Sequence, residues 1–166
     1  KDDVIDMFHN EPGITFVEQA EQKGTGHAVM VCRDALADFD GDLLIIAGDM
    51  PLVRSETLEL LVKTHKSQNS AVTLATALLE DPSGYGRIVR DSYGNLEGIV
   101  EEGDCTPEQK KIKEVNPSYY CFNKPLLFEA LQQVRPNNVK GELYLTDALQ
   151  ILIGAGFPAS LAASGL

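Results

Sequence analysis

The sequence predicts an α/β domain in which a mixed, mostly parallel β-sheet carries helices on both faces. Residues 43–47 and 71–79 are continuous apolar runs without polar alternation, typical of strands buried on both faces of such a sheet. Helical patterns precede and separate these two runs, so strands and helices alternate along the first half of the chain. With 166 residues, the chain is long enough for one domain with a substantial core.

The first half of the chain follows this alternation from element to element. The predicted elements are, in order, an amphipathic helix end at residues 4–8, a strand at 14–18, a helix from about Thr25, the strand at 43–47, a helix with Ser55 as N-cap, and the strand at 71–79. The order strand, helix, strand, helix, strand favours parallel strands joined by right-handed crossovers.

Short strands and turns replace this alternation in the second half. The predicted elements are a turn-rich loop at residues 81–86, a hairpin of strands at 87–90 and 96–101, a short helix capped by Thr106, a strand at 115–122 with Pro117 at a bulge or edge, a helix at 124–134, a helix capped by Thr146 that runs through Ile153, and a strand at 157–162. The hairpin therefore marks a subregion within the α/β domain.

Composition excludes several classes of function. The net charge of −11 disfavours a nucleic-acid or anionic-membrane surface. No apolar run approaches the roughly 18–20 residues that span a bilayer. Cys32, Cys105 and Cys121 are widely spaced, which fits packing in a reducing, cytoplasmic compartment better than a disulfide framework or a zinc site. The polar start without an initiator Met leads us to expect a piece of a longer protein.

Two loops are candidate ligand sites. Asp49 follows the apolar run at 43–47, at the carboxyl end of a predicted central strand, where ligands bind in open α/β sheets. A strand-ending turn explains an Asp there equally well. The glycine-rich loop before the helix from Thr25 offers backbone N–H groups to an anion or a base edge, although such turns are common. His27 fits packing in the first turn of its helix better than a role as a base. His65, near the end of its helix, fits a solvent-facing residue or one satisfied by the helix dipole better than a catalyst.

Six blocks of sequence, in this order, resemble the uridyltransferase domain of bacterial bifunctional N-acetylglucosamine-1-phosphate uridyltransferases (GlmU type). They are AEQKGTGHA (20–28), AGDMPL (47–52), DPSGYGRIV (81–89), GIVEEGDCTPEQ (98–109), IKEVN (112–116) and GELYLTD (141–147). The resemblance covers roughly residues 12–160. It implies a Rossmann-like nucleotide-diphospho-sugar transferase fold with a β-hairpin sugar-binding subregion. The implied parts are nucleotide-binding at about 1–80, sugar-binding at about 81–147, and a closing helix and strand at about 146–163.

The resemblance implies that UTP and N-acetylglucosamine 1-phosphate react to give UDP-N-acetylglucosamine and pyrophosphate, a cytoplasmic step in peptidoglycan and lipopolysaccharide precursor synthesis with Mg²⁺ as cofactor. Asp49 matches the catalytic Mg²⁺ ligand, a hard carboxylate oxygen of the kind that Mg²⁺ prefers. The matched substrate-binding residues are Gln19, Gly24 and Thr25 for uracil and ribose, Gly86, Glu101 and Asn116 for the N-acetylglucosamine moiety, and Tyr144 and Thr146 near the sugar pocket.

Each match also has an ordinary structural interpretation. Gly86 can serve loop geometry alone, Glu101 can be a solvated strand end, and Gln19 can close a strand. Arg87 can be a solvated or an ion-paired residue outside the site. Another nucleotide-sugar pyrophosphorylase of the same fold, or a non-catalytic binding module, remains an alternative for the chain as a whole.

The sequence also departs from the family pattern. A glycine-rich LAAGxGTRM loop with its following Lys, a GVNN-like block with a second Mg²⁺ ligand, and a β-helix acetyltransferase domain do not occur in it. Ala47 stands where the family often has Tyr, and Pro117 and Ser118 replace a Thr-Gly pair. Without the triphosphate cradle we expect the isolated chain to be nearly inactive. Without a first strand we expect an exposed apolar sheet edge that invites self-association. The resemblance implies a homotrimeric full-length protein, held by the C-terminal domain.

Overall fold

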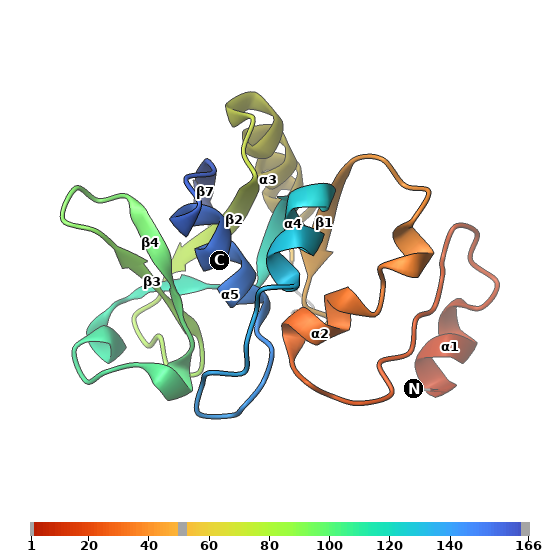
Figure 1. Ribbon diagram of the computed structural model, residues 1–166, viewed down its shortest axis with the longest axis horizontal. Coiled ribbons are helices and arrows are strands. Elements are labelled where there is room, and N and C mark those ends of the chain that lie inside the picture. The colour runs from red at the N-terminus through yellow and green to blue at the C-terminus, as the bar shows by residue number, and fades with distance from the viewer. Residues whose placement is uncertain (1, 50–52, 164–166) are drawn as a thin grey trace.

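The computed structural model describes residues 2–49 and 53–163 and contains one mixed sheet with helices on both faces (Figure 1). The strands are β1 (Asp42–Ile46), β2 (Val72–Leu78), β3 (Gly86–Arg90), β4 (Leu96–Val100), β5 (Glu114–Asn116), β6 (Tyr119–Asn123) and β7 (Ala159–Ala163). The helices are α1 (Asp2–Phe8), α2 (Thr25–Met30), α3 (Ser55–Gln68), α4 (Lys124–Leu131) and α5 (Leu145–Gly154), with 3₁₀ turns η1 (Asp34–Leu36), η2 (Glu102–Asp104) and η3 (Gln109–Lys111). None of the described helices is both long enough and apolar enough to cross a bilayer.

The strands are ordered β1-β6-β2-β5-β3-β4, and β7 pairs with β2 outside this path. The pairing of β2 with β7 is parallel, whereas the other pairings among the described strands are antiparallel. The α/β fold class is thus confirmed, but the prediction of mostly parallel pairing was wrong. The apolar runs indicate only that both faces are covered, and they do not indicate which strand is the hydrogen-bonding neighbour. β1 and β2 do run in the same direction, with antiparallel β6 between them.

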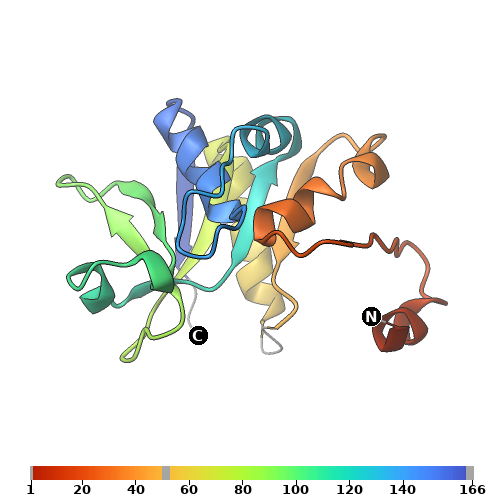
Figure 2. The ribbon, with the colours of Figure 1, turned by 60° about the horizontal axis from the view of Figure 1, so that its bottom comes forward.

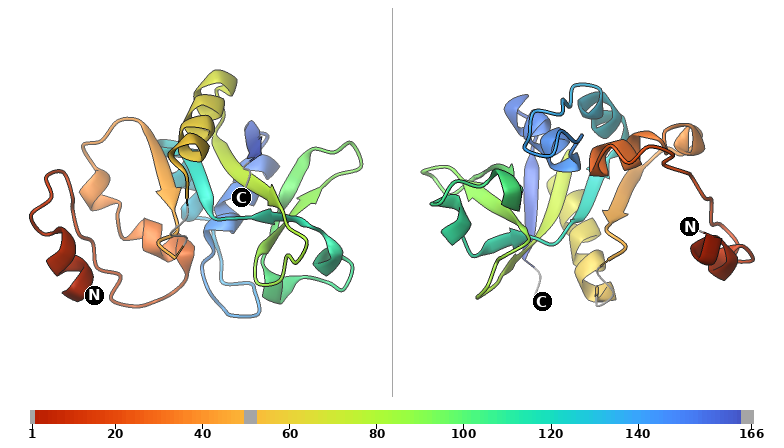
Figure 3. Two further views of the ribbon diagram at one scale, coloured as in Figure 1. Left: turned by 180° about the vertical axis from the view of Figure 1, so that it is seen from behind. Right: turned by 90° about the horizontal axis from the view of Figure 1, so that it is seen from below.

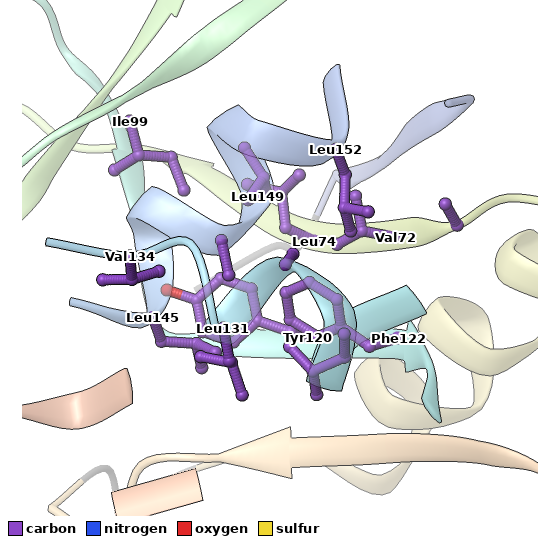
Figure 4. Close-up of a cluster of buried hydrophobic side chains, with 14 of the residues drawn as sticks. Val72, Leu74, Ile99, Tyr120, Phe122, Leu131, Val134, Leu145, Leu149 and Leu152 are labelled. Atoms are coloured by element: carbon purple, nitrogen blue, oxygen red, sulfur yellow. The ribbon is translucent and has the colours of Figure 1, made fainter. Parts of the chain in front are cut away.

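The two faces of the sheet bury alternate residues of the same strands. On one face, α4 and α5 cover Val72, Leu74, Tyr120 and Phe122 (Figure 4). On the other face, α3 packs against β2, β6 and β7, with Leu61 in contact with the intervening residues of these strands. The view from below separates the layers, with α3 on one side of the strands and α4 and α5 on the other (Figure 3). The unalternating apolar run of β2 is explained by this double burial.

β1 was predicted to be a central strand, and this was wrong. It pairs with β6 along one side, and no described strand pairs with its other side. Leu44 and Ile46 are therefore 42% and 46% exposed. The self-association expected of such an edge stays a prediction.

The strand predicted at residues 14–18 is absent. Ile14, Phe16 and Val17 are exposed, and the segment runs as extended chain at the periphery, beyond α2 (Figure 2). β propensity alone does not make a strand where no described strand lies alongside to complete the hydrogen bonds.

Several predicted boundaries shift. The strand expected at 115–122 is two strands, β5 and β6, separated at Pro117 and Ser118, where Ser118 has a φ of 62°. The short helix after Thr106 is the 3₁₀ turn η3, closed by reciprocal hydrogen bonds between Thr106 and Gln109, each of which accepts from the other's backbone N–H. The structure ends α4 at Leu131, three residues earlier than predicted.

Two predicted N-caps lie inside their helices. Ser55 is the first residue of α3, whose cap position is Arg54, and the cap position of α5 is Tyr144, so Thr146 lies in the first turn. Sequence patterns locate helix ends only to within one or two residues. The shift matters for Thr146, because it frees the hydroxyl for a side-chain partner.

Candidate functional site

A cavity of about 370 Å³ lies where α2, the ends of β1 and β6, and the start of α5 meet. It is lined by four of the predicted site residues, namely Thr25, Glu101, Tyr144 and Thr146. These residues come from three separate sequence blocks and from both the predicted nucleotide-binding part and the predicted sugar-binding part of the chain. Apolar residues of α2, β1 and α5 make up much of the remaining wall, and Lys140 is the only basic residue among the described ones that line it.

The glycine-rich loop forms one wall because it pairs with the backbone of the GELYLTD block. The N–H of Leu143 donates to the carbonyl of Lys23 at 2.7 Å, and the N–H of Gly26 donates to the carbonyl of Leu143 at 2.8 Å. Thr25 Oγ1 accepts from the N–H of Leu145 at 3.0 Å. The loop therefore brings α2 against the start of α5 (Figure 1).

The two glycines of this loop are required by close backbone contact. A Cβ on Gly24 would lie 2.6 Å from the Leu143 carbonyl oxygen, and Gly24 also has a φ of 106°. A Cβ on Gly26 would lie 2.9 Å from the same oxygen. The loop positions Thr25 at the cavity. Gly24 does not line the cavity itself, and it contributes by allowing the loop to pack closely against Leu143.

Gln19 contacts the same loop through its side-chain amide. Its amide Nε2 lies 3.1 Å from the carbonyl oxygen of Gly24 and 3.0 Å from Nδ1 of His27. Gln19 is not among the residues that line the cavity. In this structure its amide nitrogen orders the loop, so a direct contact with uracil stays a prediction.

Glu101 is one of the half-buried acids that line the cavity. Its Oε1 accepts a hydrogen bond from Thr146 Oγ1 at 3.1 Å, and its Oε2 lies 3.3 Å from where a Cβ on Gly86 would stand. Gly86 thus leaves room for the carboxylate. Burial raises the pKa of Glu101 above its ordinary value of 4.5, although the hydrogen bond from Thr146 acts in the opposite direction. Burial also raises the pKa of Tyr144 to about 12, so this side chain is neutral.

The raised pKa of Glu101 predicts a pH-dependent stability. The native state binds more protons than the unfolded state between 4.5 and the raised pKa, so the free energy of unfolding falls as pH rises through that window. Replacing Glu101 with Gln removes this penalty. We expect E101Q to have a higher Tm than the wild type at pH 7, and the difference to shrink as pH approaches 4.5. Thermal unfolding followed by circular dichroism measures it. E97Q, at an exposed position of β4, should show no such trend, and a pH-independent difference for E101Q would contradict the assignment.

Asn116 lies behind the cavity wall. Its Nδ2 donates to the Tyr120 hydroxyl at 2.5 Å, and its Oδ1 accepts from the N–H of Ser118 at 3.1 Å. Asn116 also pairs with Gly86 in the β3–β5 register. Tyr120 and Ser118 line the cavity instead, so a direct sugar contact by Asn116 stays a prediction.

Asp49 lies just past the carboxyl end of β1, two residues after Ala47, which lines the cavity. Its side chain is exposed, and the rest of its sequence block, residues 50–52, lies outside the described residues. The described residues contain no group of three or more His, Cys, Asp or Glu able to hold a metal. Mg²⁺ is usually held by one or two carboxylates with water and substrate phosphates, so an exposed carboxylate fits a single ligand. Its role as the metal ligand stays a prediction.

An ion pair of Arg87 lies beside the cavity. The ion-paired interpretation of Arg87 is confirmed, although its partner was not predicted, and the solvated interpretation was wrong because the side chain is buried. Arg87 is 1% exposed, and its Nη2 lies 2.7 Å from Oε2 of Glu102, which lines the cavity next to Glu101. Another nitrogen of Arg87, Nη1, donates to the carbonyl of Tyr85. The two consecutive glutamates of the EEGD motif were the sequence signal for a partner of Arg87. The motif does not indicate which of the two glutamates faces the cavity and which one pairs with Arg87.

The chain is similar in sequence to curated bifunctional GlmU proteins. The chain is 50% identical over 145 residues to the bifunctional protein GlmU of Solibacter usitatus, an alignment that covers 87% of this chain and 31% of the relative. It is 48% identical over 143 residues to the GlmU protein of Synechococcus sp. RCC307, covering 86% of this chain and 32% of the relative. The resemblance inferred from the six blocks is confirmed. The chain spans about a third of the length of these curated relatives.

A solved structure has a similar fold. A UDP-glucose pyrophosphorylase complexed with UDP-glucose aligns with a TM-score of 0.64 at 19% identity, over 95% of this chain and 62% of that one. The model of the family described as "Nucleotidyl transferase" matches residues 5–163. Because that match takes in almost the whole chain, the chain belongs to the nucleotidyl transferase family.

Proposed function

We propose that this chain carries the nucleotide- and sugar-binding part of a uridyltransferase that forms UDP-N-acetylglucosamine and pyrophosphate from UTP and N-acetylglucosamine 1-phosphate. The observation that carries the proposal is the single cavity shared by Thr25, Glu101, Tyr144 and Thr146. The identity to GlmU proteins supports the choice of base and sugar. The product would serve peptidoglycan and lipopolysaccharide synthesis in the cytoplasm.

The reaction needs positioning more than proton transfer. The sugar phosphate attacks the α-phosphorus of UTP in line and pyrophosphate leaves. The chain must therefore hold the attacking phosphate oxygen opposite the leaving pyrophosphate. The wall around Thr25 would receive the nucleoside. The Glu101 carboxylate, oriented by Thr146, would accept hydrogen bonds from sugar hydroxyls. Mg²⁺, with Asp49 as one ligand, would supply neutralisation of phosphate charge.

The charge of the cavity wall bears on turnover. Glu101, Glu102 and Glu142 line it, against Lys140 as the sole basic residue among its described lining residues. A triphosphate would meet more negative than positive charge there. We therefore also propose that the isolated chain binds UDP-N-acetylglucosamine but releases pyrophosphate from UTP at a rate close to that of the uncatalysed reaction.

Binding by the isolated chain tests the proposal. We expect UDP-N-acetylglucosamine to bind in a calorimetric or NMR titration, more tightly than UDP-glucose. The variant E101Q should weaken binding about 10- to 150-fold, the equivalent of about 1.5–3 kcal/mol for a hydrogen bond to a charged group. Pyrophosphate release with UTP, sugar phosphate and Mg²⁺ is measured in parallel.

A matched control separates the site from general charge effects. Glu108 is exposed and paired with Lys111, so E108Q should bind as the wild type does. Equal losses in both variants, or a folded wild type that binds no UDP-sugar at millimolar concentration, would refute the proposal. A preference for UDP-glucose would favour another pyrophosphorylase of this fold. Robust pyrophosphate release would refute the expected inactivity alone.

A further inference from the structure

The loop between α4 and α5 connects two walls of the cavity. The N–H of Val139 donates to Oδ1 of Asp104 at 2.8 Å, in the turn η2 that follows Glu101. Further along the loop, the N–H of Leu143 donates to the carbonyl of Lys23 in the glycine-rich loop. The loop therefore crosses from the Glu101 side of the cavity to the side of the glycine-rich loop. It lies between α2 and the segment that carries η2 and η3 (Figure 1, Figure 3).

A tight turn holds the backbone of this loop at the cavity. Asn138 bonds twice to the backbone of Glu142, because its Nδ2 donates to the carbonyl at 2.6 Å and its Oδ1 accepts from the N–H at 3.1 Å. The N–H of Gly141 donates to the carbonyl of Asn138 at 3.0 Å, and Gly141 has a φ of 67°. Lys140 lies within this closed turn, and both Lys140 and Glu142 line the cavity.

The ammonium group of Lys140 has no hydrogen-bond or ion-pair partner among the described residues. By contrast, Lys23, Lys111 and Lys113 each pair with a glutamate, at 2.6, 2.8 and 2.6 Å. Three glutamates line the cavity beside Lys140, so its lack of an ion pair does not come from a lack of acids nearby.

Two of these glutamates have other partners. Glu102 pairs with the buried Arg87, and Glu101 accepts from Thr146. Burial is the main cause of the raised pKa of Glu101, and the positive charge of Lys140 acts in the opposite direction. Lys140 therefore supplies the cavity with a positive charge that no described side chain neutralises by direct contact. Such a charge favours an anionic ligand.

The covalent structure of a nucleotide sugar places its anionic part near this loop. A diphosphate joins the nucleoside to the sugar, so it must lie between the parts of the cavity that would receive these two groups. Thr25 is on the nucleoside side of the proposed site and Glu101 on the sugar side, and the loop of Lys140 connects these sides. Arg87 cannot serve the diphosphate, because it is buried and already paired.

We propose that Lys140 is a ligand-binding residue whose ammonium group contacts the diphosphate of the bound nucleotide sugar. This rests on the proposed function. It assigns the unpaired charge of Lys140 to ligand binding, and it makes Asn138, which closes the turn, a positioning residue.

Two substitutions separate the charge of Lys140 from its size. K140M removes the ammonium group and keeps a long side chain, whereas K140R keeps the charge. In calorimetric titrations at about 50 mM salt, we expect K140M to bind UDP-N-acetylglucosamine about 3- to 10-fold more weakly than the wild type, and K140R to stay within about 2-fold of it. At about 500 mM salt the deficit of K140M should shrink, because salt screens exposed charges.

A matched control removes the same charge elsewhere. Lys63 is exposed on α3, which covers the opposite face of the sheet from α4 and α5, so K63M should bind as the wild type does. If the folded wild type binds no UDP-sugar, the proposed function fails and the role of Lys140 fails with it. If the wild type binds and K140M binds equally well, the role of Lys140 is refuted and the proposed function stands. A deficit of K140M that does not change with salt, or an equal deficit in K140R or K63M, would also refute the diphosphate contact.

Discussion

Replacing Glu102 with alanine is expected to destabilise the protein by about 3–5 kcal/mol. Arg87 is 1% exposed, and the Glu102 carboxylate, 2.7 Å away, is its acidic partner. Removing the carboxylate would leave a buried guanidinium without compensating charge. The free energy of unfolding from urea titration measures the effect.

A double-mutant cycle tests the cause of that loss. E102A combined with R87M removes the stranded charge, so the double variant should be more stable than E102A alone. The control is E108A, which breaks the exposed pair with Lys111 and should cost less than about 1 kcal/mol. A loss for E102A no larger than that of E108A would show that the pair contributes nothing beyond a surface contact.

Replacing Gly26 with alanine is expected to cost about 1–3 kcal/mol, the range for overpacking. The added Cβ would lie 2.9 Å from the Leu143 carbonyl oxygen and 3.0 Å from the backbone carbon and oxygen of Tyr144. Backbone atoms cannot rotate away as a side chain does. Helix propensity acts in the opposite direction, because alanine is favoured over glycine by about 1 kcal/mol within a helix. We expect the clash to exceed this gain, and Thr25 to lose its place at the cavity.

The matched control for this prediction is G154A. Gly154 is also helical, and a Cβ there meets nothing within 4 Å. G154A should therefore leave the Tm unchanged or raise it, while G26A lowers it by several degrees in the same thermal scan. G26A should also bind UDP-N-acetylglucosamine more weakly. Equal Tm values for the two variants would mean that the loop moves aside without cost.

The sequence predicted the elements of this fold better than their pairing. The unalternating run at residues 71–79 correctly indicated β2, because burial on both faces leaves a direct mark on residue type. The position of antiparallel β6 between β1 and β2 has no comparable effect on residue type, since strand order depends on contacts between distant segments. Ile14 and Phe16 illustrate a different error. Their residue types favour a strand, but no described strand lies beside this segment, and both side chains are exposed.

The candidate site divides along similar lines. Glu101, Thr146 and Thr25 line the same cavity, and the binding roles that the resemblance implies for them stay predictions. The burial of Asn116 behind Tyr120 and the choice of Glu102 as the partner of Arg87 could not be predicted, because both depend on the direction in which a side chain leaves its strand. Gln19 was predicted to contact uracil, and in the structure its amide donates a hydrogen bond to the Gly24 carbonyl of the glycine-rich loop.

The position of β6 between β1 and β2 has a consequence for synthesis on the ribosome. β1 and β2 emerge early as apolar strands that do not pair with each other, and β6, at Tyr119–Asn123, follows much later. Until then the nascent chain exposes two strands with unfilled edges, the kind of species that aggregates or binds chaperones. Formation of the sheet therefore has to wait until β6 has been synthesised, and we expect β1 and β2 to depend on chaperones until then.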